Sequence, residues 1–143
     1  MAHSYCKLWI HAIWSTKNRV SLIDEKLENE LYSLLKDEFN NTGCNLSIVN
    51  GTDDHIHCLF GLNPNKSVAE VIRIVKGASS HFINHYDLTE EKFSWQRGYA
   101  AFSVSESMFK KVYYYIQNQK EYHKNKTLAE EEEGLLRLNK LIE

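Results

Sequence analysis

The chain has 143 residues, of which 43% are apolar and 12% aromatic, and its formal net charge is −2. This size and composition can build one core, so we expect a single domain over residues 1–143. No run reaches the roughly 18 apolar residues of a membrane span, and residues 1–6 lack a signal-peptide pattern, so we expect a soluble, cytoplasmic protein with no membrane partner. The charge argues against a broadly basic DNA-binding protein but permits a local basic surface.

Acidic residues gather near the end of the chain. Residues 130–133 are four consecutive glutamates within an acidic C-terminal helix or tail, residues 127–143, that we expect to lie away from any DNA. The three cysteines, Cys6, Cys44 and Cys58, have neither disulfide nor zinc spacing. They predict reduced and mostly buried thiols.

The first expected elements are a strand, a helix and a hairpin. Residues 4–14 alternate between two faces, as a strand does. Asp24 precedes leucines at three- and four-residue spacing that end at residues 41–43, which predicts a helix. Residues 46–49 and 56–62 are apolar runs on either side of an Asn-Gly-Thr-Asp-Asp turn, so we expect an antiparallel pair.

The second half of the chain contains further helix and strand patterns. Ser67 and Glu70 have the spacing of a capping box before a helical apolar pattern. Residues 93–104 favour a strand or a bent strand pair, with Gly98 at the bend. Residues 105–124 follow as one long expected helix.

The element order is that of a split βαβ arrangement. We therefore expect an α+β fold, ferredoxin-like or RRM-like, whose antiparallel sheet carries helices on one face. A tyrosine-bearing helix then follows near the C-terminus. We expect the other face of the sheet to be open and available to a ligand, although a fold does not by itself choose a function.

The residues that suggest chemistry begin with His55 and His57. Side chains alternate along a strand, so both imidazoles project from one face while Ile56, Cys58 and Phe60 enter the core. Two imidazoles about 7 Å apart can lean onto one divalent cation. Taken alone, such a pair is more often a pair of hydrogen-bonded strand histidines, and a third ligand must come from elsewhere.

The best source of that ligand is the tyrosine-rich helix. Tyr113 with Gln117 and Tyr115 with Gln119 each have i,i+4 spacing, so each pair places a phenol and an amide on one face. Helical geometry does not choose between the pairs. A phenol ionises near pH 10, so a neighbouring metal would help it attack a phosphate. The alternative reading is an aromatic packing surface.

Two segments resemble a known family. Residues 54–60, Asp-His-Ile-His-Cys-Leu-Phe, and residues 115–119, Tyr-Ile-Gln-Asn-Gln, are similar to the metal and tyrosine motifs of IS200/IS605-type single-tyrosine transposases, which belong to the HUH endonuclease superfamily. The resemblance implies that Tyr115 is the nucleophile and that Gln119 joins both histidines as a ligand of Mg²⁺ or Mn²⁺. It further implies cleavage and rejoining of single-stranded DNA at transposon ends through a 5′-phosphotyrosine.

The resemblance continues at residues 75–80, 95–99 and 102–105, so it spans most of the chain. It implies a homodimer, in which the tyrosine helix of one subunit can complete the site of the other, and recognition of DNA hairpins. Cations beside aromatic residues can hold unpaired bases and phosphates. The expected DNA-contacting residues are Lys66, Arg73, Lys76, Arg97, Lys110, Lys111 and Lys120.

Two other functions remain open at this point. One is a domesticated or inactive relative that binds hairpin DNA without cleaving it. The other is a metal-dependent phosphohydrolase in which water attacks, no covalent intermediate forms and the tyrosine helix is structural.

Overall fold

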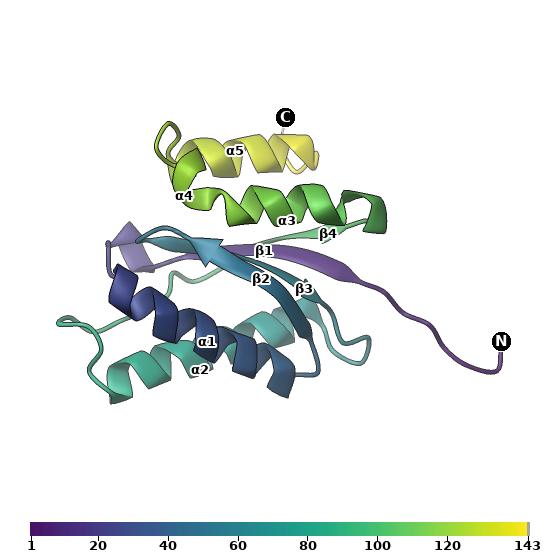
Figure 1. Ribbon diagram of the computed structural model, residues 1–143, viewed down its shortest axis with the longest axis horizontal. Coiled ribbons are helices and arrows are strands. Elements are labelled where there is room, and N and C mark those ends of the chain that lie inside the picture. The colour runs from purple at the N-terminus through teal and green to yellow at the C-terminus, as the bar shows by residue number, and fades with distance from the viewer. Residues whose placement is uncertain (143) are drawn as a thin grey trace.

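A computed structural model describes residues 1–142, and its centre is one antiparallel sheet (Figure 1). The strand order is β2-β3-β1-β4. The expected α+β architecture is confirmed, although the first strand begins later than expected. The strands are β1 (Trp9–Ser15), β2 (Asn45–Gly51), β3 (His55–Gly61) and β4 (Ala100–Val104).

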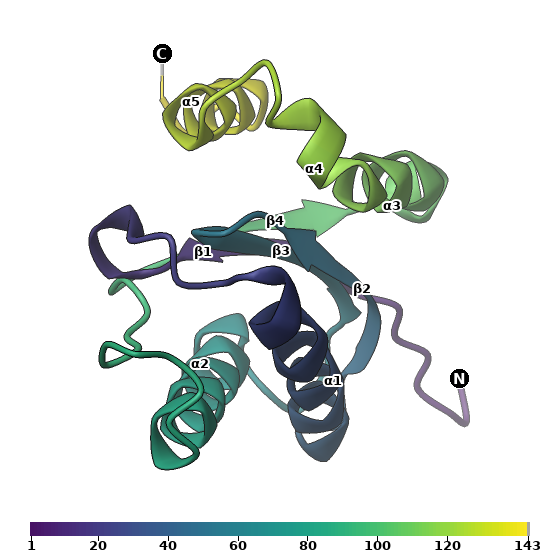
Figure 2. The same cartoon turned by 60° about the vertical axis from the view of Figure 1, so that its left-hand side comes forward.

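Two long helices cover one face of the sheet, α1 (Glu25–Asn41) and α2 (Val68–His85) (Figures 1 and 2). Each begins where the sequence places a cap. The Asp24 carboxylate accepts a hydrogen bond from the Leu27 amide, and the Ser67 hydroxyl accepts one from the Glu70 amide. These bonds satisfy amide groups that have no partner inside the helix.

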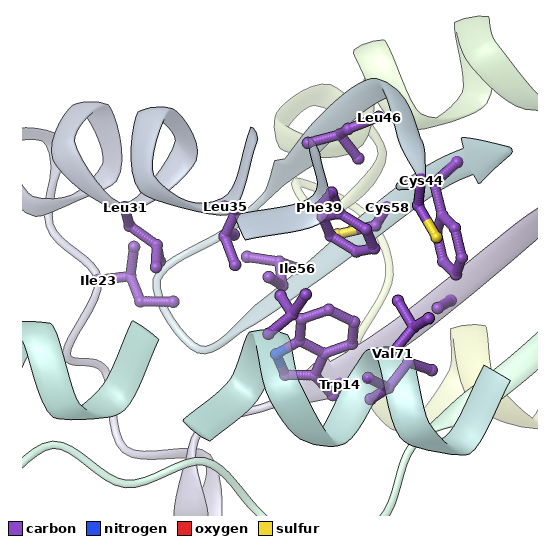
Figure 3. Close-up of a cluster of buried hydrophobic side chains, with 14 of the residues drawn as sticks. Trp14, Ile23, Leu31, Leu35, Phe39, Cys44, Leu46, Ile56, Cys58 and Val71 are labelled. Atoms are coloured by element: carbon purple, nitrogen blue, oxygen red, sulfur yellow. The ribbon is translucent and has the colours of Figure 1, made fainter. Parts of the chain in front are cut away.

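The main core lies between this face and the two helices (Figure 3). Ile56, Cys58 and Phe60 of β3 are all fully buried there, as their alternation predicts. Phe60 packs on Phe39 of α1, with ring centroids 4.7 Å apart. This packing fixes which face of β3 enters the core. Because side chains alternate along a strand, His55 and His57 project from the opposite face.

The opposite face is not open, and that expectation is wrong. Three helices lie over it: α3 (Phe109–Gln117), α4 (Gln119–Tyr122) and α5 (Leu128–Leu138) (Figure 2). The cause is a second apolar cluster in which Leu59 and Val104 of the sheet meet Ile116 of α3. Burial of these side chains holds α3 on the sheet.

The long helix expected over residues 105–124 is broken. A short 3-10 turn, η2 (Glu106–Met108), precedes α3, and Asn118 interrupts the helix with φ −97° and ψ 19°. Asn50 of β2 supports the break, since its side-chain amide donates to the carbonyls of Ile116 and Gln117 at 3.0 Å each. The break lets α4 turn away from the axis of α3.

The segment before β4 is bent rather than a continuous strand. Trp95 forms an isolated bridge with Thr16, beside the short turn η1 (Lys17–Arg19), and Gly98 has φ +90°, which favours glycine. Cys44 and Cys58 are buried and Cys6 is exposed, all with free thiols. Among residues 1–142, no helix combines the length and apolar character that a membrane span needs.

Candidate functional site

The two strand histidines lie on β3 beneath the C-terminal helices. His55 is 1% exposed and His57 has no exposed surface. Their ring centroids are 5.3 Å apart, and both rings project from the same side of the sheet. The pair is therefore a buried centre of polar groups, which requires partners for every ring nitrogen.

The β2–β3 hairpin orients His55. Its Nδ1 lies 2.8 Å from an Asp54 carboxylate oxygen and 2.9 Å from the Thr52 hydroxyl. A Cβ at Gly51 would lie 2.0 Å from the His55 carbonyl oxygen, so only glycine permits this tight turn. Burial disfavours the charged ring, but the carboxylates of Asp54 and Glu131 outweigh it and raise the pKa of His55 to about 9.

A third histidine, His11 of β1, orients His57. Its Nε2 lies 2.8 Å from His57 Nδ1, across the β1–β3 pairing. Burial first, and then the neighbouring imidazole, lower the pKa of His11 to about 3, and burial also lowers the pKa of His57. When His57 Nε2 binds a metal, Nδ1 must carry the proton, and neutral His11 is its acceptor.

Replacing His11 with phenylalanine should weaken metal binding about 10- to 100-fold, because His57 Nδ1 loses its acceptor. The dissociation constant for Mn²⁺, measured by titration calorimetry, checks this. His11→Gln keeps an acceptor and should retain most of the affinity. Wild-type affinity in the phenylalanine variant would show that His11 does not position His57.

The tyrosine helix brings Tyr115 and Gln119 to the histidines. The Tyr115 ring centroid is 5.8 Å from that of His57. Gln119, the first residue of α4, is fully buried and its Oε1 lies 3.3 Å from His55 Nε2. The break at Asn118 directs this amide inward. Of the two tyrosine–glutamine pairs that the sequence left open, this pair faces the histidines.

The rival pair points elsewhere. Tyr113 packs in the apolar cluster beside Phe109, with ring centroids 6.1 Å apart. Gln117 is exposed. Tyr114 is 57% exposed. Within the described chain, neither of these tyrosines therefore reaches the histidine pair.

Glu131 of α5 lies at the centre of the site, which the sequence did not predict. Residues 130–133 were expected to lie away from any DNA, whereas Glu131 is buried against the histidine pair, with 1% of its surface exposed. One carboxylate oxygen, Oε1, lies 2.9 Å from His57 Nε2. The other, Oε2, accepts hydrogen bonds from the Tyr115 hydroxyl and, at 2.9 Å, from the Gln119 amide.

The sequence held one signal for this placement. Thr127 and Glu130 form a complete capping box, which fixes where α5 begins. Helical spacing then puts Leu128 and Glu131 on one face, and both are the buried residues of that helix. Leu138, at the end of the same helix, is 77% exposed, so the face that carries Leu128 and Glu131 is the inner one.

His123, in the connection before α5, completes the cluster and was also missed. Its Nε2 lies 3.0 Å from Glu131 Oε1, and its Nδ1 lies 2.8 Å from the Lys126 carbonyl oxygen. The ligand atoms of His55, His57, His123 and Glu131 all lie within 4.8 Å of one another. Imidazole nitrogens and a carboxylate oxygen are donors that suit a divalent metal.

The charges around Glu131 favour a cation. Burial raises the pKa of its carboxyl, but hydrogen bonds from His55 and His57 outweigh this and hold the pKa well below its usual range. Burial and the adjacent Glu131 carboxylate raise the pKa of the Tyr115 phenol. Without a cation the phenol is therefore a poorer nucleophile than a free tyrosine.

Metal affinity should rise about tenfold per pH unit between pH 7 and 8.5. Below its pKa of about 9, His55 carries a proton in the metal-free protein, and a metal must displace that proton to reach the nitrogen. Calorimetry in two buffers of different ionisation enthalpy should register release of about one proton at pH 7. Equal affinity across this range would contradict the protonated state of His55.

A wide cleft reaches the site from the hairpin side. Its volume is about 1020 Å³, and its lining includes His55, His123 and Lys120. Lys120 of α4 is not free, since its ammonium group lies 2.9 Å from the Glu28 carboxylate and 2.7 Å from the Asn50 amide oxygen. A strand of DNA in this cleft would compete with Glu28 for Lys120.

The other expected DNA-contacting residues do not form one surface. Lys66 lies in the turn just before α2 and Arg73 lies on α2, the helix that covers the sheet face opposite the site. Lys76 donates to the carbonyls of Gln96 and Gly98 at 2.7 and 2.9 Å, so it holds the bend before β4.

Three exposed cations lie nearer the site face. Lys110 and Lys111 are on α3. Arg97 lines a smaller pocket, of about 280 Å³, between the β4 region and α5. Together with Lys120, these three are the expected DNA-contacting cations that lie on the side of the C-terminal helices.

Comparison with known families agrees with this geometry. A family model described as "Transposase IS200 like" matches residues 4–119. The chain belongs to the IS200-like transposase family. The matched segment of this transposase contains His55, His57, Tyr115 and Gln119 and ends before His123. Membership makes the chain a DNA-cleaving enzyme of DNA recombination.

Individual relatives support the same family. The transposase is 25% identical to the ISDra2 transposase TnpA of Deinococcus radiodurans over 118 residues, which cover 79% of this chain and 84% of that protein. A solved structure of a putative transposase from Deinococcus radiodurans aligns with TM-score 0.66 and 26% identity, covering 83% of this chain and 95% of that one.

A further solved structure shares the fold. It is a REP-associated tyrosine transposase bound to a REP hairpin. It aligns with TM-score 0.64 and 15% identity, covering 85% of this chain and 72% of that one. This likeness shows that the two proteins share a fold.

Proposed function

We propose that this transposase cuts and rejoins single-stranded DNA at transposon ends through a covalent 5′-phosphotyrosine on Tyr115, with a metal held by His55, His57 and Gln119. The observation that carries the proposal is the convergence of one phenol, one amide and two imidazoles in a single buried cluster. Tyr115 meets that cluster through the Glu131 carboxylate, and Gln119 meets it through His55.

The chemistry requires one bond exchange at phosphorus. The Tyr115 oxygen loses its proton and bonds to the phosphorus, and the 3′ oxygen of the preceding nucleotide leaves and takes a proton. The phosphotyrosine linkage conserves the energy of the broken phosphodiester bond. A new 3′ hydroxyl can therefore attack the phosphorus, release Tyr115 and rejoin the strand. A divalent cation would withdraw charge from the scissile phosphate. The family motif, the buried imidazoles and the inward-facing Gln119 support this assignment.

The test is incubation of the protein with a single-stranded hairpin end and Mg²⁺ or Mn²⁺, followed by denaturing electrophoresis. The proposal predicts a DNA–protein band that resists denaturation and disappears with a chelator. Cleavage without such a band would indicate a phosphohydrolase. Binding without cleavage in any divalent metal would indicate a domesticated hairpin-binding protein.

We further propose that the substrate carries a hairpin and that the protein works as a cytoplasmic homodimer of one-domain subunits. The hairpin bound to the REP-associated relative supports the first part. The dimer, and exchange of the tyrosine helix between its subunits, rest on the family resemblance. For DNA contact we retain Lys110, Lys111, Arg97 and Lys120, which lie on the side of the C-terminal helices.

Binding of a single-stranded hairpin should weaken steeply as salt rises, because phosphates release counterions when cations neutralise them. With about four phosphate contacts, affinity should fall roughly 50-fold between about 0.05 and 0.2 M salt. Fluorescence anisotropy with a labelled hairpin measures this. Duplex DNA of the same sequence should be a poor substrate, so equal cleavage of duplex and single strand would contradict a single-strand site.

A further inference from the structure

Glu131 Oε1 is surrounded by more nitrogen atoms than one carboxylate oxygen can accept from. His57 Nε2 lies 2.9 Å away, His123 Nε2 3.0 Å and His55 Nε2 3.5 Å. One oxygen offers two lone pairs. Glu131 Oε1 therefore cannot accept good hydrogen bonds from all three rings at once. Hydrogen bonds alone do not account for three ring nitrogens around this oxygen.

The groups that contact the Nδ1 atoms of His123 and His55 show where the ring protons lie. His123 Nδ1 faces the Lys126 carbonyl, which can only accept, so that nitrogen carries the proton. His55 Nδ1 faces the Asp54 carboxylate in the same way. In their neutral forms both rings consequently aim a bare lone pair at the Glu131 carboxylate. The amide oxygen of Gln119, 3.3 Å from His55 Nε2, adds another lone pair.

The spacing of these atoms matches one metal ion. Ligand atoms about 2.1 Å from an ion lie about 3 Å apart when they are adjacent in its coordination sphere. The separations from Glu131 Oε1 to the three ring nitrogens run from 2.9 to 3.5 Å.

We propose that His123 Nε2 and Glu131 Oε1 are two further ligands of the same metal, so that the C-terminal helix completes the metal centre. This inference rests on the proposed metal role of His55, His57 and Gln119. It extends the site beyond residues 4–119, which are all that the family match covers. Five protein ligands leave one position of an octahedral ion for a phosphate oxygen.

The donor set also selects the ion. Three imidazoles suit Mn²⁺, Co²⁺ or Zn²⁺, whereas Mg²⁺ prefers oxygen ligands and retains its waters. The wild-type protein should therefore bind Mn²⁺ and Co²⁺ at least about 100-fold more tightly than Mg²⁺. This differs from a site of two imidazoles and an amide, in which Mg²⁺ would compete more closely.

The test is calorimetric titration of the full chain with Mn²⁺ and with Co²⁺. Glu131→Gln keeps the shape of the side chain but removes its charge, and His123→Ala removes the other ligand. Each should raise the Mn²⁺ dissociation constant at least about tenfold and shift the visible spectrum of bound Co²⁺. Glu133→Gln is the matched control, since Glu133 lies on α5, is exposed and pairs with Arg137. It should bind as wild type.

The outcomes separate this inference from the proposed function. Circular dichroism of the metal-free variants must match wild type, and Glu131→Gln retains an oxygen that can accept from Gln119, so α5 should stay docked. If His57→Ala loses Mn²⁺ while Glu131→Gln and His123→Ala keep wild-type affinity and spectra, this inference is overturned and the proposed function stands. Tighter Mn²⁺ binding by Glu131→Gln would overturn it too, because the carboxylate would then obstruct the site. A wild-type protein that binds no divalent ion overturns both.

Discussion

Replacing Tyr115 with phenylalanine is expected to abolish the covalent DNA adduct, with a loss of more than about a thousandfold in cleavage rate. The substitution removes one oxygen and keeps the ring, so packing against Tyr122, whose centroid is 5.4 Å away, should persist. Metal binding should remain within a few-fold of wild type. Denaturing electrophoresis measures the adduct, and calorimetry measures the metal.

Tyr113→Phe and Tyr114→Phe are the matched controls on the same helix. Tyr113 packs in the apolar cluster and Tyr114 points into solvent, so both variants should retain adduct formation within about threefold. An adduct formed at wild-type rate by Tyr115→Phe would exclude that phenol as the nucleophile. Loss of the adduct in Tyr113→Phe alone would transfer the role to the rival pair.

Replacing His57 with alanine should lower metal-dependent cleavage more than about a hundredfold, because a proposed metal ligand is lost from the centre of the site. The ring has no exposed surface, so its removal also leaves a cavity and takes a partner from Glu131. We therefore expect a loss of about 1–3 kcal/mol in the free energy of unfolding, in addition to the lost metal. Cleavage assays with chelator-treated protein and defined Mn²⁺ check the first effect, and urea unfolding checks the second.

His81→Ala provides the control for His57→Ala. His81 is an exposed histidine of α2, far from the site and stacked on His85 at 5.8 Å between ring centroids. The His81→Ala variant should cleave DNA and bind metal as the wild type does. Full cleavage by His57→Ala at defined metal would remove His57 from the metal centre, whereas low cleavage in both variants would point to a general loss of stability.

Local patterns predicted much of the fold. The alternation around Ile56 places Cys58 and Phe60 in the core and sends the histidines to the other face, as strand geometry requires. Asp24 and Ser67 cap their helices, because a side-chain oxygen next to a free amide is a local device. Such features depend on neighbours in the sequence, so the sequence alone can reveal them.

The parts that were missed depend on contacts between distant elements. The covered sheet face follows from Leu59 meeting Ile116, and periodicity within either segment does not contain that contact. The break at Asn118 is held by Asn50 of another strand. In the sequence, Glu131 belongs to a run of four glutamates, and such a run usually lies in solvent. Only its helical phase with Leu128 separated it from them.

The residue that orients His57 was likewise not predictable from sequence motifs. His11 lies far from His57 in the sequence and meets it only because β1 pairs with β3. His11 also alternates on a strand like any core residue, so nothing local marks its role. A buried histidine becomes informative once its partner nitrogen is known.

The most direct measurement of the central claim is peptide mapping of the trapped DNA–protein adduct. The wild-type protein is incubated with a hairpin end and Mn²⁺, digested with a protease and a nuclease, and the nucleotide-bearing peptide is sequenced by mass spectrometry. We predict one phosphodiester-linked nucleotide residue on Tyr115, within the peptide that spans residues 112–120. A nucleotide on Tyr113, or DNA cleavage with no tyrosine modified, would contradict the account.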